Sequence, residues 1–480
     1  MAGTTAVEQY DVVVVGVGAA GAAAALNAQE HGAHVLIIEK CPRESAGGNT
    51  RVSGGGWFIN TSPERAEVFL RALNGSRPVA ADVVQTWALE TAKNSEWLRG
   101  LGAVVRQTGN FHTGPEFAEL EGADCYDGMD TIKGEMGQSL LYEFLLGALE
   151  DRGIEIRFDT RAEDLIVEDG TVCGVQVQGQ AGRMQIRAGG GVVLATGGFA
   201  GNPAMVRDYL RLEDYVLWGS PNNTGDGHRL AQQVGADLWH MDNMMSITGI
   251  NVDKKTGMYL ALWSGNSYVL VAQDGRRLID ETAANRHGHV KRNGHEELFP
   301  LNPFFLVFDE AMRTAGPLSP SKETLPVGWN LLMEEQEWSA DNSLEVAGGM
   351  IQRAQTLREL AELTGIDPDT LERSIKNYNA CCEEGRDDQF GRPANTLAPV
   401  AQAPFYALRV VPLLGWSDGG PRRDGRARVL NTSGKVIEGL YVAGEASATY
   451  SWLKDGGFHI ADALAFGRVA GAHAAGRAAG

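Results

Sequence analysis

Three glycines and a carboxylate near the start of the chain have the spacing of a dinucleotide-binding site. Gly16, Gly18 and Gly21 form the pattern G-x-G-x-x-G. In this pattern the first glycine permits a tight turn, the second lets the backbone approach a pyrophosphate, and the third lets a helix pack closely on a strand. Glu39 stands 18 residues after Gly21, where a carboxylate can accept hydrogen bonds from both hydroxyls of a ribose. Alone, the glycines also fit a turn in an unrelated α/β protein.

The surrounding sequence places these residues in one strand-helix-strand unit. Residues 11–15 are dominated by valine, which is typical of a parallel strand buried on both faces. Residues 22–28 continue a helix whose N-terminal amides would point at phosphates, and residues 34–38 form a second strand that ends at Glu39. This context favours a Rossmann-type nucleotide-binding fold. Further cofactor-binding candidates here are Ala19, Ala20 and Lys40.

A second glycine-rich stretch, residues 47–58, follows the expected ribose site. Many glycines before two aromatic residues indicate backbone that lies flat against a planar group, which at this position would be a flavin ring system. A mobile surface loop is the alternative. The cofactor-binding candidates are Gly48, Asn49, Thr50, Ser53, Gly54, Gly55 and Gly56. Trp57 is a candidate substrate contact.

Two later stretches repeat the pattern of a buried strand followed by glycine. They are residues 190–199 and 439–445, and residues 223–227 open another helix. Ligands of open α/β sheets bind at the carboxyl ends of the strands. Segments that converge on one extended ligand in this way predict FAD, and not NAD, as the resident cofactor. They add the candidates Ala195, Thr196, Gly197, Gly198, Asp226, Gly444, Glu445 and Gly457.

Charge and apolar content narrow the class of protein. The 480-residue chain has a formal net charge of −19, whereas nucleic acid or an anionic membrane surface would require a basic patch. No apolar run reaches the ~18 residues that cross a bilayer, and residues 1–9 lack the features of a signal peptide. The five cysteines have no metal-ligand spacing. We therefore expect a cytoplasmic protein with no metal site, no nucleic-acid partner and no membrane insertion.

The recurrence of glycine-rich strands predicts an α/β fold with a discontinuous FAD-binding domain. This domain comprises residues 8–239 and 401–480, and residues 240–400 form an inserted α+β capping domain for the substrate. In the FAD-binding domain we expect helices over 62–100, 137–151 and 460–475 and a long loop over 110–131. In the insertion we expect a strand pair over 259–280, a strand at 304–308, and helices over 343–363 and 367–383.

Together these motifs resemble the flavoprotein family of soluble fumarate reductases and succinate dehydrogenase flavoprotein subunits, which includes tricarballylate dehydrogenase and 3-ketosteroid dehydrogenases. The resemblance rests on residues 11–39, 47–56, 193–199, 224–227, 274–281 and 440–445. It implies a two-electron exchange between FAD and a carbon–carbon bond next to a carbonyl or carboxyl group. Hydride moves at one carbon and a proton at its neighbour, and either ene-reduction or desaturation fits.

The resemblance also implies a proton-transfer residue. In fumarate reductases an Arg supplies the proton a few residues after a motif that residues 275–281 resemble, and Arg286 follows Glu281 by five residues. Arg286 is therefore the first catalytic candidate. Because a guanidinium holds its proton tightly, a relay group must resupply it, and Glu281, His287 or His289 could do so. A surface arginine beside a turn is the alternative.

Four polar clamps of the fumarate reductases are replaced here mainly by aromatic and small residues. The replacements lie at residues 245–249, 260–264, 415–420 and 450–455. A pocket with aromatic walls in place of carboxylate-binding groups should accept a substrate that is larger, flatter or less anionic than fumarate. The segment of residues 450–455 adds Tyr450 and Asp455 as catalytic candidates. Candidate substrate contacts are Trp416, Trp452 and, just after the last segment, His459.

Non-covalent binding of FAD is expected. Relatives that tether the flavin use a His, and Asn49 stands at the corresponding place. The predicted partners are a small-molecule substrate and an electron donor or acceptor such as NAD(P)H, a quinone or oxygen. The alternative is a flavoprotein of another chemistry, an oxidase or isomerase, or a non-catalytic FAD-binding protein on the same fold.

Overall fold

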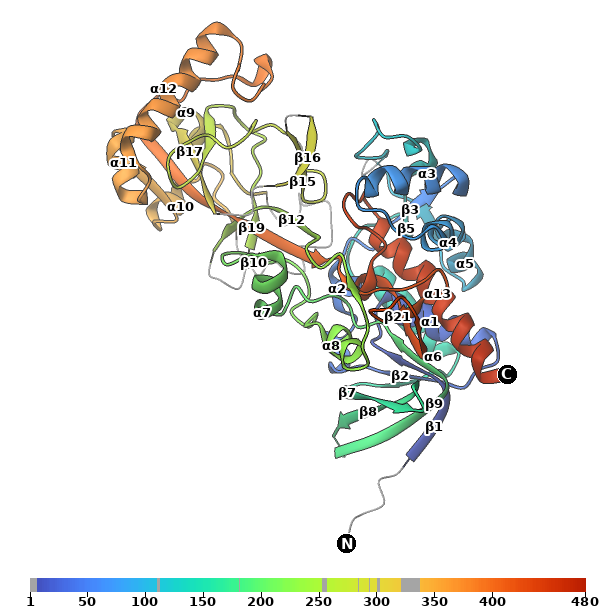
Figure 1. Ribbon diagram of the computed structural model, residues 1–480. Helices are drawn as coiled ribbons and strands as arrows, with labels where there is room; N and C mark the ends of the chain where they lie inside the picture. The colour runs from blue at the N-terminus through green and yellow to red at the C-terminus, as the bar shows by residue number, and fades with distance from the viewer. Residues whose placement is uncertain are drawn as a thin grey trace.

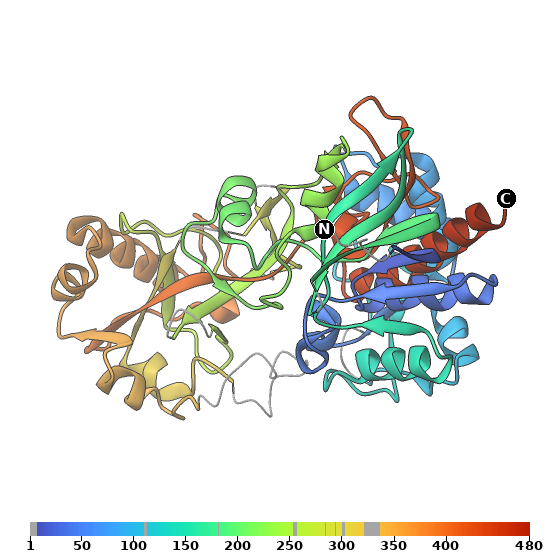
Figure 2. The same ribbon diagram turned by 90° about the horizontal axis from the view of Figure 1, so that it is seen from below.

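The computed structural model describes residues 7–109, 113–180, 182–252, 257–283, 285–292, 294–299, 303–320 and 337–480. These residues form two lobes (Figures 1 and 2). The large lobe contains the N-terminal strand and the C-terminal helix. The cap lobe is formed mainly by the middle of the chain.

An eight-stranded sheet forms the centre of the large lobe. Its order is β21-β22-β9-β1-β2-β6, and β8 joins β7 to β9. The run from β22 to β6 is parallel, so the predicted α/β class is confirmed. The strands are β1 (Val7–Val15), β2 (Val35–Ile38), β6 (Glu155–Arg157), β7 (Arg161–Glu168), β8 (Thr171–Gly179), β9 (Gly182–Leu194), β21 (Arg428–Leu430) and β22 (Val436–Val442).

Both faces of this sheet are buried, which explains the valine run in β1. Val12 and Val14 pack beneath the helices on one face, whereas Val13 packs on the opposite face against β7, β8 and α8, because successive side chains of a strand alternate between faces. The covering helices are α1 (Ala19–Glu30), α6 (Leu140–Asp151), α8 (Asp226–Gln233) and α13 (Phe458–Ala479).

A smaller unit at the edge of the large lobe differs from the sequence prediction. The chain forms β5 (Tyr126–Ile132) at the end of the expected loop over 110–131, of which residues 110–112 lie outside the described part. β5 is polar in sequence, and pairing with its two neighbours overrides its weak intrinsic preference. The other elements are α3 (Pro63–Asn74), α4 (Ala81–Thr91), α5 (Asn94–Gly100), β3 (Trp57–Asn60) and β4 (Val105–Gln107).

The cap lobe is organised on a seven-stranded sheet of order β13-β12-β19-β17-β14, with β10 and β18 also paired to β19. The long strand β19 reaches from the cap lobe towards the large lobe (Figure 1). Two strands of the cap sheet lie outside residues 240–400, because β10 precedes residue 240 and β19 follows residue 400. The strands are β10 (Val216–Leu217), β12 (Met244–Asn251), β13 (Gly257–Tyr259), β14 (Tyr268–Val271), β17 (Phe304–Asp309), β18 (Ile351–Ala354) and β19 (Phe405–Ser417).

Two expectations for the cap lobe were wrong. β13 pairs with β12 and β14 pairs with β17, and the pairing within residues 259–280 is reduced to one antiparallel bridge between Val271 and Arg277. The expected helix over 343–363 is α10 (Ser343–Ala347), then β18, then α11 (Leu357–Thr364). Gly348 and Gly349 end the first helix, and a capping box between Thr356 and Glu359 starts the second. The remaining cap helices are α9 (Glu310–Ala315) and α12 (Pro368–Glu384).

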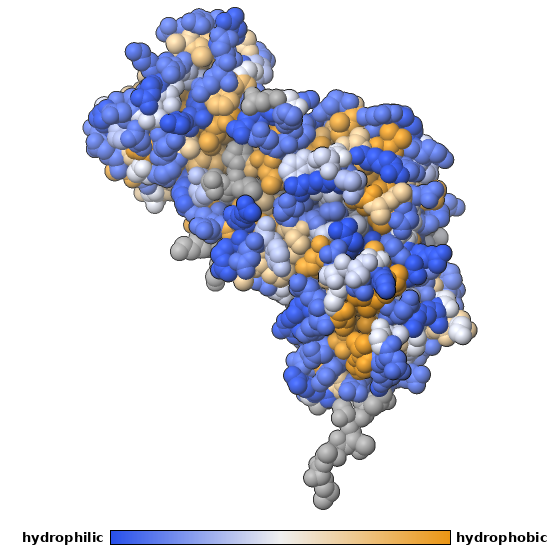
Figure 3. Space-filling view, in the orientation of Figure 1, coloured by the Kyte–Doolittle hydropathy of each residue, from blue (hydrophilic) through white to orange (hydrophobic). Residues whose placement is uncertain are grey.

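Hydrophilic residues cover most of the face shown in Figure 3. Over the described residues, no helix combines the length and the apolar character needed to cross a bilayer.

Candidate active site

A cavity of about 470 Å³ extends from the carboxyl ends of the parallel strands to the cap lobe. Its lining combines the turns after β1, β2, β9 and β22, the glycine-rich segment around α2 (Gly48–Val52), the start of α13, and cap residues from β12, β13 and β19. This volume lies within the range of small-molecule sites. The sequence segments predicted to converge on one ligand therefore do line one cavity.

The turn after β1 forms the first end of the cavity. Gly16 has φ +102°, and a Cβ there would lie 2.4 Å from the carbonyl oxygen of Ala195, so only glycine fits. The Ala19 amide donates to Thr50 Oγ1 at 2.9 Å. The Glu39 carboxylate accepts from the Val17 amide at 3.1 Å, which fixes it at the end of β2.

Lys40 and Asp226 line the same end and bind each other. Lys40 Nζ lies 2.6 Å from Asp226 Oδ2, and Arg161 Nη2 lies 2.6 Å from Asp226 Oδ1. Although burial acts in the opposite direction, these two cations lower the pKa of Asp226 to about 2. Asp226 therefore stays ionised and holds two long side chains beside the cavity.

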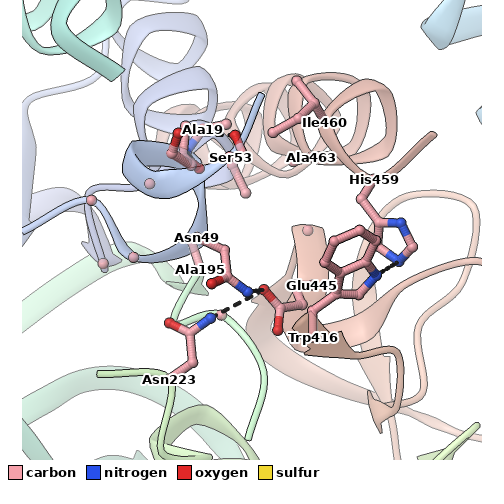
Figure 4. A pocket seen from close by; sticks show the side chains of 18 of the residues that line it. Ala19, Asn49, Ser53, Ala195, Asn223, Trp416, Glu445, His459, Ile460 and Ala463 are labelled. Atoms are coloured by element: carbon pink, nitrogen blue, oxygen red, sulfur yellow. Dashed lines mark hydrogen bonds between the residues drawn. The ribbon is translucent and has the colours of Figure 1, made fainter. Parts of the chain in front are cut away.

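A buried carboxyl lies in the middle of the cavity. Asn49 and Asn223 both donate to Glu445 Oε2, at 2.8 and 3.1 Å (Figure 4). Burial raises the pKa of Glu445 to about 8, despite the hydrogen bonds from the two amides. Glu445 is therefore mostly neutral at pH 7 and can donate as well as accept a hydrogen bond.

His287 and two acids form a cluster at the cap end of the cavity. His287 Nδ1 lies 2.7 Å from Glu116 Oε1, and the Glu116 amide donates to Asp455 Oδ2 at 2.9 Å. Burial alone would lower the pKa of His287, but Glu116 raises it above its ordinary value. Burial and the charge of Glu116 raise the pKa of Asp455 to about 7. This cluster can therefore hold or release a proton near neutral pH.

His459, in the first turn of α13, belongs to a second buried array. Its Nε2 lies 2.5 Å from Asp418 Oδ1 and 3.0 Å from the indole nitrogen of Trp416, and Lys454 Nζ lies 2.7 Å from Asp418 Oδ2. Burial lowers the pKa of both His459 and Lys454. Trp416 and His459 lie next to each other beside Glu445 in Figure 4.

Aromatic rings form the cap-side wall. Trp218 and Tyr259 are nearly parallel, with ring centroids 6.4 Å apart, and Tyr259 lies 6.1 Å from Trp263. Met245 and Ile247 complete this wall. Trp263 is 66% exposed, so the wall extends from the interior to solvent and offers apolar contact area to a ligand.

Most predicted cofactor-binding residues line the cavity. They are Gly16, Gly18, Ala19, Ala20, Glu39, Lys40, Gly48, Asn49, Thr50, Ser53, Gly54, Gly55, Gly56, Ala195, Thr196, Gly197, Asp226, Gly444, Glu445 and Gly457. Gly21 and Gly198 lie just behind the lining. A Cβ at Gly21 would lie 1.9 Å from the Gly16 carbonyl oxygen, and one at Gly198 would lie 2.3 Å from Glu445 Oε1. Both therefore allow the lining to pack closely.

Of the predicted catalytic and substrate residues, His287, Asp455, Trp416 and His459 line the cavity, whereas the aromatic candidates Trp57, Tyr450 and Trp452 do not. Trp57 is fully buried and donates to Ser95 Oγ at 2.8 Å.

The side chains of Tyr450 and Trp452 are also engaged elsewhere. The Tyr450 hydroxyl donates to the Phe458 carbonyl oxygen at 2.6 Å. Trp452 packs against His289, with ring centroids 4.6 Å apart. These two rings, like that of Trp57, support the walls from behind.

Glu281 and Arg286 also lie outside the lining of the cavity. Glu281 Oε2 accepts from Arg277 at 2.8 Å and from Arg392 at 3.3 Å, in a fully buried cluster that holds the cap together. Arg286 binds Glu119 and Glu296. The structure thus brings His287 to the cavity and directs its neighbour Arg286 away.

The sequence reasoning missed several lining residues. Glu116 lies in the segment interpreted as a loop, and no local pattern marks it. Asn285, Tyr259 and Trp263 come from stretches without a motif, although Trp263 falls in one of the segments where polar clamps are replaced. Among the described residues, no group of three or more His, Cys, Asp or Glu is placed to hold a metal ion.

The geometry fits an extended dinucleotide cofactor. Phosphates can be bound at the amides that begin α1, a ribose at Glu39, and a planar ring between the glycine-rich segment of residues 47–56 and the start of α13. The fold and the site therefore define a nucleotide-binding flavoprotein.

Comparison with known proteins gives the family. The model of the FAD binding domain family matches residues 11–464, so the chain belongs to this family. NADH:acrylate oxidoreductase of Vibrio harveyi is 28% identical over 97% of this chain, which spans only 50% of that relative. The 3-oxosteroid 1-dehydrogenase of Mycolicibacterium smegmatis is 29% identical over 96% of each chain.

A solved structure agrees with these relatives. A flavocytochrome c3 fumarate reductase in its open conformation has a TM-score of 0.68 and 27% identity, and the match covers 98% of this chain and 79% of that one. The resemblance to fumarate reductases and ketosteroid dehydrogenases and the prediction of FAD are confirmed.

Proposed function

We propose that this chain exchanges hydride and a proton with a carbon–carbon bond next to an activating group, by ene-reduction or desaturation. The two relatives named above support this class, since acrylate contains an alkene conjugated with a carboxyl group and the steroid enzyme dehydrogenates a ketone. The observation that carries the proposal is His287, an ionisable imidazole that lines the same cavity as the glycine-rich segment of residues 47–56.

The roles of the residues follow from their positions. When bound, FAD supplies the two-electron donor or acceptor for hydride at one carbon. In reduction the His287 imidazolium donates the proton to the neighbouring carbon, and in desaturation the neutral imidazole accepts it. Glu116 stabilises the imidazolium, and Asp455 holds the Glu116 backbone in place. Arg286 is not assigned the proton, because it lies outside the lining and binds two carboxylates.

The substrate is proposed to be larger and less anionic than fumarate. The acidic and imidazole side chains that line the cap end, within the described residues, are Glu116, His287, Asp455 and His459. A dicarboxylate there would meet two acids and one imidazolium, His287, which is already paired with Glu116. At least one of its carboxylates would therefore be buried without a cationic partner, which costs several kcal/mol. The aromatic wall instead suits a neutral, conjugated molecule.

Reoxidation of the reduced flavoprotein tests this function. The holoprotein is photoreduced without oxygen and mixed with acrylate, fumarate or an aryl-substituted enone, and the flavin absorbance is followed. We expect the enone to restore the oxidised spectrum faster than fumarate and to gain two hydrogens. Reoxidation by oxygen alone would indicate an oxidase, and rapid reoxidation by fumarate would contradict the proposed substrate class.

FAD is proposed to be bound without a covalent link, and NAD(P)H, a quinone or oxygen to be the second redox partner. Asn49, which the family resemblance puts at the place of the tethering His, donates to Glu445 Oε2 and accepts from the Ser220 amide. Acid precipitation should therefore release the yellow colour into the supernatant. Colour that stays with the pellet would show a covalent link.

A further inference from the structure

One turn of the large lobe is held by two adjacent residues of the cap lobe. Residues 116–119 bind Arg286 and His287, which precede β15 (His289–Arg292). The turn is anchored, because Phe117 is fully buried in the hydrophobic core of the large lobe. This contact therefore joins an anchored turn of the large lobe to two adjacent residues of the cap lobe.

Arg286 is engaged on several sides. Its Nη1 donates to Glu119 Oε1 at 2.6 Å and to the Glu116 carbonyl oxygen at 3.3 Å, and its Nη2 binds Glu296. The guanidinium carbon lies 4.2 Å from the centre of the Phe117 ring, within the range of a cation–π contact. Three residues of the turn thus contact one side chain of the cap.

The cap presents Arg286 and His287 in a fixed orientation. The amide of Arg286 donates to the His289 carbonyl oxygen at 2.8 Å, and the amide of His289 donates back at 3.1 Å. His287 lies between them with φ +46°. Because this turn is closed, a shift of Arg286 relative to residues 116–119 would also separate His287 from Glu116.

We propose that Arg286 is a positioning residue, which holds the turn of residues 116–119 so that Glu116 stays paired with His287. The inference rests on the proposed function for its catalytic meaning, since it assigns the proton to His287. Whether Arg286 keeps Glu116 paired with His287 can be measured without turnover. Arg286 acts through Glu116 and touches neither the reacting atoms nor the cofactor.

Several charged or titratable groups face His287 besides Glu116. They are Asp455, Lys454, His289 and His459. None of them can take the place of Glu116 as the anion beside His287. Asp455 has a pKa of about 7, so it is only partly ionised near neutral pH, and the other three side chains are basic. The charge of His287 therefore depends chiefly on Glu116.

The test measures the pKa of His287 in flavin-loaded protein with ¹³C-labelled histidine, with the resonance assigned from the variant His287→Gln. Arg286→Gln removes a nearby positive charge, which by itself would raise the pKa of His287. Loss of the contact with Glu116 would lower the pKa of His287, because burial of the imidazole would then be the larger effect. We expect a fall of about one unit or more.

Arg286→Lys keeps the charge but loses the planar fork, so a fall in the pKa of His287 with this variant isolates geometry. Glu121→Gln is the matched control, because Glu121 lies two residues after the turn and is 77% exposed, and its ion pair among the described residues is with Arg65, at 4.0 Å; it should leave the titration unchanged. A pKa of His287 that is unchanged in Arg286→Lys, or raised in Arg286→Gln, overturns the proposal.

Failure of every alkene to reoxidise the flavin would reject the proposed function and leave this titration to decide the positioning role.

Discussion

The two ends of the cavity are built in different ways. The end at β1 is formed by turns that follow parallel strands of one sheet, and each turn is a short run of neighbouring residues. The end at the cap lobe takes single residues such as Glu116, Tyr259 and His287 from segments far apart in the chain. Cofactor binding is therefore encoded locally, whereas the substrate end depends on how the lobes meet.

The two ends of the cavity also differ in whether their charged groups change ionisation near neutral pH. At the β1 end, Lys40 and Arg161 hold Asp226 ionised, with its pKa lowered to about 2. At the cap end, burial and a neighbouring acid raise the pKa of Asp455 to about 7. Fixed charges suit the binding of an invariant cofactor, and groups that titrate near pH 7 suit proton exchange.

The largest effect is expected from Gly21→Ala at the β1 end. A helical glycine replaced by alanine ordinarily gains ~0.5–1 kcal/mol of stability. Here the new Cβ would lie 1.9 Å from the Gly16 carbonyl oxygen, and a backbone atom cannot move aside. We expect loss of bound FAD and of all activity, measured by the ratio of flavin to protein absorbance.

Gly147→Ala is the control for this variant. Gly147 lies in α6, and a Cβ there would meet no atom within 4 Å. It should retain FAD and melt at the same or a higher temperature. Equal flavin content in both variants would show that the close packing at Gly21 is not required.

The next effect concerns the cap end. His287→Gln keeps a polar side chain but removes the proton-exchanging group, so turnover should fall by ~10²–10⁴, the usual contribution of a positioned acid or base. Flavin content should not change, because the residue lies at the other end of the cavity. His295→Gln, at an exposed position on the neighbouring strand β16 (His295–Leu298), should be unaffected. Full activity of His287→Gln would remove His287 from the mechanism.

The β1 end of the cavity could be predicted from the sequence better than the cap end. Gly16, Gly18, Glu39, Ala195 and Gly444 could be singled out from the sequence and line one cavity in the structure, because each depends on local backbone geometry. Arg286 and His287 were both proposed, but their adjacent positions could not show which one faces the cavity. That choice depends on the turn of residues 116–119, which comes from another lobe and has no sequence signature.

The pH dependence should separate the two directions of the reaction. Glu116 raises the pKa of His287 above its ordinary value, so the imidazolium persists to higher pH. Reduction needs this form and should be constant below that pKa and fall about tenfold per unit above it. Desaturation needs the neutral form and should rise with pH up to the same pKa. Parallel profiles for the two directions would contradict this role.

The smallest effect is expected at the rim of the cap end, where Trp263 is 66% exposed and lies beside Tyr259. Trp263→Ala removes one ring of the aromatic wall, and contacts between rings contribute ~0.5–1.5 kcal/mol. The KM of an aryl-substituted enone should therefore rise about 2- to 12-fold, while kcat and the kinetics with acrylate stay the same, because a small substrate does not reach the rim. Trp263→Phe keeps a ring and should recover most of the affinity. If acrylate and the enone lose affinity equally in Trp263→Ala, the residue supports the fold of the cap lobe and does not contact the substrate.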